Sequence, residues 1–186
     1  TLRDTNKTHY LLLAKLNSSL KPAWAIYYDN ILGSQVPTYD VFVDAADNVY
    51  LLVHGNYSLI IGGVTYSPSA TNGILKISSS GTIIYYKQVP YTLFNMLGAA
   101  DANENAYVTG VAYGSSKTIT VDGASATNTN PLFNSNSVID QFMIKFNSAG
   151  VAQWANLSNN ALSNTGAVTF GPNGIALDSK ANIFVY

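Results

Sequence analysis

The sequence repeats itself three times, and this internal repeat constrains the fold more than any other feature. Its first mark is an apolar segment ending in a lysine, followed by a compact turn and by an aromatic residue nine positions after the lysine. The copies are KLNSSLKPAW from Lys15 to Trp24, KISSSGTIIY from Lys76 to Tyr85, and KFNSAGVAQW from Lys145 to Trp154. Turn residues between two apolar segments predict a β-hairpin in each copy.

A second mark also occurs three times. An apolar run leads into an aspartate, an asparagine follows four positions later, and an aromatic residue stands six positions after the aspartate. The three sets are Asp44, Asn48 and Tyr50; Asp101, Asn105 and Tyr107; and Asp178, Asn182 and Phe184. We expect each aspartate to end a strand. We expect each asparagine to lie where the chain turns, because Asn tolerates left-handed backbone and bonds to the local main chain.

The residues one and three positions before each aspartate have the period-two pattern of a strand with one face toward a core. They are Val43 and Val41, Ala100 and Gly98, and Leu177 and Ile175. Each repeat therefore predicts four short strands: one into the Asp, one out of the Asn, one ending at the Lys, and one carrying the aromatic residue. The Gly/Ser/Thr/Asn-rich segments at about 54–73 and 111–141 are predicted to be variable loops.

A repeated four-stranded unit of about 65 residues is what a blade of a β-propeller looks like. The predicted fold class is therefore all-β and propeller-type, with three four-stranded repeats in a single domain at 1–186. The strand order is permuted, with a partial repeat at 1–43, repeats at 44–100 and 101–177, and a partial repeat at 178–186.

Three blades are fewer than the usual four to eight or so. The chain is then expected to be a piece of a larger propeller, or to pair its open ends with another copy as a six-bladed dimer or a strand-complemented polymer. A locally different β fold also remains open.

The segments KFNSAGVAQWAN, GIALDSKANIFVY and ADANENAYVTG closely resemble the β-propeller repeat family often called SBBP repeats. The resemblance covers essentially the whole chain. It implies a propeller fold in a secreted or surface protein, mostly of bacteria and of some eukaryotic microbes. It implies little about activity, because propellers host many unrelated functions.

The charge content excludes several partners. Only 10% of the residues are charged, against about 25% in an average domain, and the formal net charge is -1. Because the 9 basic and 10 acidic residues are scattered, we expect neither nucleic acid nor an anionic membrane surface as a partner. No apolar run is long enough for a membrane-spanning helix. The chain begins at Thr1 without a leader-like segment, which predicts that any targeting segment was removed or never included.

The residue types that usually carry catalysis are scarce. There is no cysteine, His9 and His54 are the only histidines, and Glu104 is the only glutamate. A nucleophilic triad or a pair of glutamates is therefore not predicted, and we expect no catalytic residue and no cofactor. One weak metal candidate is the set Asp101, Asn103 and Asn105, which partly matches a calcium loop. The alternative is that these residues only form the repeat's turn, since Ala106 replaces the loop's glycine.

Other candidate sites follow from position. Four N-x-[ST] sequons make candidate glycosylation sites, if the protein passes through a glycosylating route: Asn6, Asn17, Asn56 and Asn156. The identical offset of the three repeat aromatics predicts that they pack between blades. Candidate ligand contacts are instead the aromatic residues of the variable loops, because loops on rigid scaffolds often carry function: Tyr57, Tyr66, Tyr113 and Phe133.

The expected function is a non-catalytic scaffold for structural assembly, adhesion or ligand binding, located outside the cell or on its surface. Its expected partners are copies of itself, a larger parent chain, or glycans. One alternative is a hydrolase or lyase acting on polysaccharides in the propeller channel, which requires converging carboxylates. Another is a lectin, which predicts equivalent loop aromatics in every blade.

Overall fold

The described part of the protein is entirely β. The computed structural model describes residues 9–29, 38–53, 59–61, 64–66, 71–90, 93–112, 118–129, 140–158 and 171–186. These residues form sixteen strands and no helix, so none of them belongs to a helix that could cross a membrane. Every strand pairing among them is antiparallel. The predicted all-β class is confirmed.

Two repeats form complete four-stranded sheets in the predicted strand order. The second sheet has the order β3 (Thr38–Val43), β4 (Val49–Val53), β7 (Thr71–Ile77) and β8 (Ile83–Pro90). The third sheet has the order β9 (Leu93–Ala100), β10 (Ala106–Ala112), β13 (Asp140–Phe146) and β14 (Ala152–Leu157). In each sheet the first strand leads into the repeat's aspartate and the fourth carries its aromatic residue.

The remaining repeat strands form two half-repeats. β1 (His9–Leu16) and β2 (Pro22–Asp29) are the third and fourth strands of a repeat, and β15 (Ile175–Leu177) and β16 (Ile183–Val185) are the first and second. The first sheet joins β1 and β2 to β5 (Leu59–Ile61) and β6 (Val64–Tyr66) in the order β1-β2-β5-β6. β15 and β16 form a two-stranded sheet, here called the last hairpin.

The prediction that the long connections are loops was wrong in part. The first contains the β5–β6 hairpin, and the second contains a hairpin of β11 (Thr118–Val121) and β12 (Ala124–Thr127). Asp122 and Gly123 join β11 to β12 with φ of 51° and 86°, as a two-residue type I′ turn requires. Ile119 and Val121 bury their side chains in the core, and that burial stabilises the hairpin.

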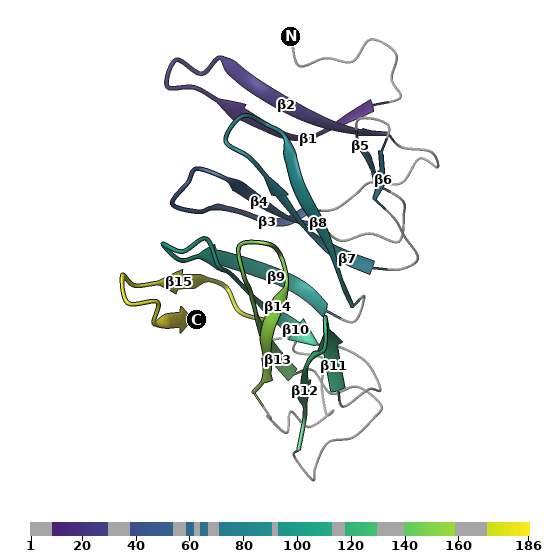
Figure 1. The fold of residues 1–186 in the computed structure, drawn as a ribbon, viewed down its shortest axis with the longest axis vertical. Coiled ribbons are helices and arrows are strands. Elements are labelled where there is room, and N and C mark those ends of the chain that lie inside the picture. Colours follow the sequence, from purple (N-terminus) through teal and green to yellow (C-terminus); the bar gives the residue numbers. More distant parts are fainter. Residues whose placement is uncertain are drawn as a thin grey trace.

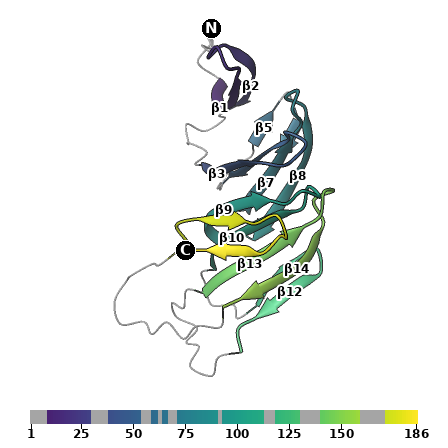
Figure 2. The same cartoon turned by 90° about the vertical axis from the view of Figure 1, so that its left-hand side faces the viewer.

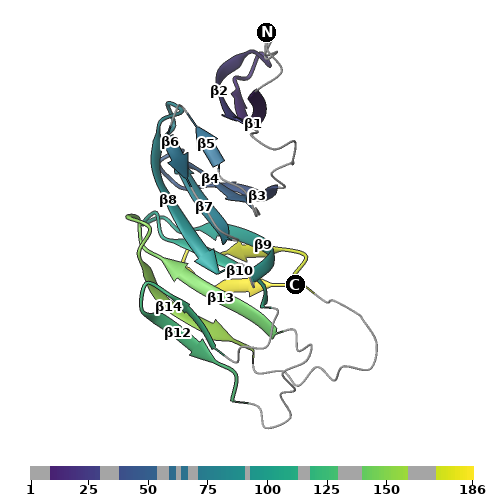
Figure 3. The ribbon, with the colours of Figure 1, turned by 90° about the vertical axis from the view of Figure 1, so that its right-hand side faces the viewer.

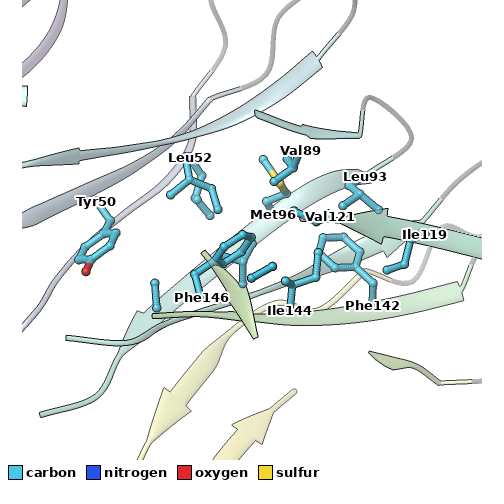
Figure 4. Packing of buried hydrophobic residues seen from close by; sticks show 14 of the residues in the cluster. Tyr50, Leu52, Val89, Leu93, Met96, Ile119, Val121, Phe142, Ile144 and Phe146 are labelled. Carbon is cyan, nitrogen blue, oxygen red and sulfur yellow. The ribbon is translucent and has the colours of Figure 1, made fainter. Parts of the chain in front are cut away.

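The sheets stack along the chain, as Figure 1 shows, with the β1–β2 hairpin and the last hairpin on opposite sides of the two complete sheets. One apolar cluster, which includes Ile26, Leu51 and Leu75, lies between the first and second sheets. A larger cluster joins the second sheet to the third (Figure 4) and includes Leu52 and Phe142. β4 is buried along its whole length because its side chains enter one cluster on each face, Leu51 the first and Leu52 the second.

The stack is open in this structure. Figures 2 and 3 show the β1–β2 hairpin at the end of the stack away from the last hairpin. The described strands form several antiparallel sheets, as predicted. They close into neither a barrel nor a propeller ring, so these residues do not form a closed three-bladed propeller. The first strands of successive repeats do lie side by side, since β3 contacts β9 and β9 contacts β15.

The expectation that Val41 and Val43 face a core was wrong. Their side chains are 51% and 59% exposed, whereas Phe42 stacks on Tyr50 with ring centroids 4.8 Å apart. The equivalent residue in the next repeat, Gly98, is buried where the edge of the Phe42 ring lies against its α-carbon. The difference has a simple cause: the first sheet contains only the third and fourth strands of its repeat, so it offers no first strand to cover β3.

Candidate functional site

The aspartate and asparagine of each repeat form one turn, built the same way three times. The Asp carboxylate accepts hydrogen bonds from two backbone amides and from the Asn side chain, at 2.7 to 3.1 Å. The left-handed residue is not the Asn, as expected from sequence, but the one before it: Asp47, Glu104 and Ala181, with φ of 60°, 61° and 59°. The bonds to the carboxylate therefore offset the cost of left-handed backbone, which is higher at Glu104 and Ala181 than at Asp47 because Asp tolerates this region.

The Asp44 turn is also the centre of a buried charge network between the second and third sheets. Lys76 Nζ lies 3.2 Å from the Asp44 carboxylate and 2.9 Å from that of Glu104 in the next repeat. The side chains of Lys76 and Asp44 are 2% and 0% exposed. The Tyr50 hydroxyl donates to the backbone carbonyl of Glu104 at 3.0 Å, and Lys76 Nζ stands 5.1 Å from the centre of the Tyr50 ring.

Burial and hydrogen bonding shift the pKa values of these groups in opposite directions. Burial raises the pKa of the Asp44 carboxyl, but hydrogen bonds from Asn48 and Lys76 outweigh it, so the pKa lies below its ordinary value. The Asp101 carboxyl follows the same rule, with Asn105 and Tyr107 as donors. Burial lowers the pKa of the Lys76 ammonium, and its bonds to Glu104 and Asp44 more than reverse that effect. Each of these groups is therefore charged at neutral pH.

These pKa shifts predict how stability depends on pH. A depressed Asp pKa stabilises the fold above the unfolded value of about 4, and this contribution is lost as the pH falls through the folded pKa. The raised pKa of Lys76 stabilises the fold below about pH 10 and is lost above it. The urea midpoint should be flat near neutrality and should fall below about pH 4. Asp101→Asn should make the fall of the urea midpoint at acidic pH shallower. An unchanged fall would contradict the lowered pKa of Asp101.

The aromatic residue of one repeat packs on the turn of the next. The Trp24 ring lies over Gly81, whose φ is +91°, and a Cβ there would come 2.8 Å from the ring. Trp24 Nε1 donates to the Ser79 carbonyl of the same turn at 3.0 Å. One repeat later, Tyr85 lies over Gly150 (φ +77°), again 2.8 Å from the position of a Cβ. The predicted packing between repeats holds for Trp24 and Tyr85.

The repeat lysine contacts the same turn. Lys15 Nζ lies 3.4 Å from the Ser79 carbonyl, and Lys76 Nζ lies 3.5 Å from the Ser148 carbonyl, which is the equivalent atom one repeat later. Each junction between repeats thus combines an aromatic ring on a left-handed turn residue with an ammonium near a turn carbonyl. We call this combination the turn contact.

The third aromatic, Trp154, is in a different environment. Its side chain is 36% exposed and packs at a tilt against Tyr107, with ring centroids 6.2 Å apart. Among the described residues no turn of a following repeat lies over Trp154. A cavity of about 330 Å³ adjoins it, lined by Met143, Leu157 and Ile183 among others.

A further contact joins the β11–β12 turn to both complete sheets. Lys87 of β8 pairs with Asp122 at 2.6 Å, and the same carboxylate accepts the Ala152 amide of β14 at 3.0 Å. Sequence analysis missed Asp122. The Asp-Gly dipeptide directly after the β-branched segment Thr118–Val121 is a strong hairpin signal and could have revealed it.

The weak metal candidate, Asp101 with Asn103 and Asn105, forms the turn of its repeat. Both oxygens of Asp101 accept bonds from its own turn and from the Tyr107 hydroxyl, and Asn103 donates its backbone amide to Asp101. The described residues contain no group of three or more His, Cys, Asp or Glu side chains that could hold a metal ion.

The other candidate residues are only partly within the described residues. Asn17 accepts the Ser19 and Lys21 amides in its turn, and Asn156 is exposed on β14 beside the Trp154 cavity. Tyr66 belongs to β6. The candidates outside the described residues are Asn6, Asn56, Tyr57, Tyr113 and Phe133.

Comparison of the sequence with protein-family models finds no matching family, and comparison with curated proteins finds no match either.

Proposed function

We propose that this chain is a non-catalytic scaffold of the β-propeller type, in which repeats stack to build an assembly outside the cell or on its surface. The observation that carries the proposal is how the ionisable side chains are used. Lys76 pairs with Asp44 of its own repeat and with Glu104 of the next, and Lys87 pairs with Asp122 of the next repeat. These ion pairs hold neighbouring repeats together.

The carboxylates argue against polysaccharide cleavage. Glycoside hydrolysis usually needs two carboxyl groups facing one substrate. Glu104 is paired with Lys76, and Asp101 and Asp178 accept bonds from their own turns. The low charge of the chain lets surfaces approach without strong repulsion. The likeness of its repeats to surface and secreted propeller repeats supports the extracellular location.

The proposal is tested by activity and imaging together. The purified chain is incubated with a panel of acidic and neutral polysaccharides, and new reducing ends are measured. We expect none, and we expect electron microscopy to reveal particles with sheets arranged around an axis. Release of oligosaccharides by the chain, with loss of that release in Glu104→Gln, would overturn the proposal.

A further inference from the structure

The two half-repeats are complementary. Each complete sheet is built from four strands in order, and the third strand pairs with the second. The last hairpin supplies a first and a second strand, and β1 and β2 supply a third and a fourth. Among the described residues β16 pairs only with β15, and β1 pairs only with β2. The two unpaired edges are therefore those that meet inside a complete sheet.

Exposed apolar side chains lie where the missing halves would be. At one end of the stack they are Val41 and Val43 of β3, which face the place of an absent first strand. At the other end they are Phe184, which is 58% exposed, and Trp154. Exposed apolar side chains that lie together commonly mark an interaction surface.

We propose, on the basis of the scaffold function above, that the occupant of each end is a second copy of this chain, with β1 of one copy pairing with β16 of the other. The expected register follows from the complete sheets, in which Tyr50 pairs with Lys76 and Tyr107 with Lys145. The corresponding pairs between copies are Phe184 with Lys15, Val185 with Ala14, and Ile183 with Leu16.

Charge complementarity supports this register. The pairing brings the Lys15 ammonium to the Asp178 turn, as the Tyr50–Lys76 pair brings Lys76 to within 3.2 Å of Asp44. The sheet so completed also covers Val41 and Val43, because its first strand, β15, then lies beside β3 as β3 lies beside β9.

Leu20 makes the proposed junction between copies different from the junctions within one chain. It occupies the turn position held by Gly81 and Gly150 in the other repeats, with φ +59°, and its side chain is 78% exposed. An exposed leucine in left-handed backbone is costly. In the pairing proposed, Leu20 meets Trp154 of the other copy. Because a Cβ at this turn position comes 2.8 Å from the ring in the other two turn contacts, Trp154 must lie farther from Leu20 than Tyr85 lies from Gly150, and the adjoining cavity of about 330 Å³ gives space for that displacement.

A second copy fits better than the chain's own β1. The β1–β2 hairpin packs on the second sheet, whereas the last hairpin packs on the far side of the third sheet (Figure 1). Reciprocal pairing of two copies makes a closed ring of six sheets, and one-sided pairing makes an open fibre.

Cysteine cross-linking tests the register, because the chain has no cysteine of its own. Chains carrying Ala14→Cys and chains carrying Val185→Cys are mixed and mildly oxidised. Directly opposed residues on antiparallel strands have Cα atoms about 4.5 to 5.5 Å apart, within disulfide range. We expect a disulfide-linked heterodimer from this mixture. The control mixture of Ala14→Cys with Phe184→Cys places the two thiols on opposite faces and should give little product.

Two further measurements complete the test. Leu20→Asp, at an exposed position where Asp tolerates the backbone, should weaken self-association about tenfold or more in analytical ultracentrifugation while leaving the urea midpoint of the monomer unchanged. Equal cross-linking in both mixtures, or a monomer at every concentration, would overturn the proposal. So would an intramolecular disulfide in the Ala14→Cys/Val185→Cys double variant. The scaffold proposal is overturned by polysaccharide cleavage, which none of these experiments measures. The pairing of two copies can therefore be refuted while the scaffold proposal stands.

Discussion

Replacing Lys76 with methionine is expected to destabilise the protein by about 3 to 5 kcal/mol, the usual cost of breaking a buried ion pair from one side. The cost comes from Asp44, whose side chain is fully buried and would keep its charge without the ammonium. Glu104 contributes less, because its side chain is 38% exposed and exposed pairs are worth about 1 kcal/mol or less. Urea unfolding followed by tryptophan fluorescence measures the effect.

Lys145→Met is the matched control. Lys145 holds the equivalent position in the next repeat and lies 5.2 Å from the centre of the Tyr107 ring, but Ala181 stands where Glu104 stands in the network of Lys76. Its substitution should cost about 1 kcal/mol. Adding Asp44→Asn to Lys76→Met should recover part of the loss, since the buried charge is removed as well. Equal losses for Lys76→Met and Lys145→Met would refute the special role of the buried network.

Gly150→Ala is expected to destabilise the protein by about 2 to 5 kcal/mol through two effects. Left-handed backbone costs an alanine about 1 to 2 kcal/mol. The added Cβ would also lie 2.8 Å from the Tyr85 ring, and overpacking of this kind costs about 1 to 3 kcal/mol. The free energy of unfolding from urea titration measures the sum.

Gly123→Ala separates the two effects. Gly123 also has a left-handed backbone, with φ +86°, but a Cβ there would meet nothing within 4 Å. Its substitution should therefore cost only the backbone share, about 1 to 2 kcal/mol. If Gly150→Ala is no more costly than Gly123→Ala, then the turn contact contributes nothing to the junction between repeats.

Much of the fold could be predicted from the sequence because the repeat marks coincide with local structure. The aspartates at 44, 101 and 178 end strands because each holds its own turn through bonds spanning four residues or fewer. The lysines and aromatics pair across their hairpins, as Lys76 does with Tyr85. These interactions are local, so spacing alone reveals them.

The errors concern what lies beside each strand. The period-two pattern at Val41 and Val43 correctly predicts a strand, but which face is buried depends on whether a neighbouring sheet is present. Here Phe42 faces the neighbour and the valines do not. The pairing of Lys76 with Glu104 joins different repeats, and no spacing rule within one repeat contains it. Only their position in the long connections singles out the loop aromatics, and Tyr57, Tyr113 and Phe133 lie outside the described residues.

The Asp–Asn turn leaves one of its own positions free to vary. The backbone is held by the aspartate and the asparagine, so the left-handed residue between them can be Asp47, Glu104 or Ala181 without a change in geometry. Glu104 uses this freedom to reach Lys76 of the preceding repeat. Substitution at this single position can therefore strengthen or weaken one junction at a time, which lets the repeats diverge in how firmly they adhere while their internal architecture stays the same.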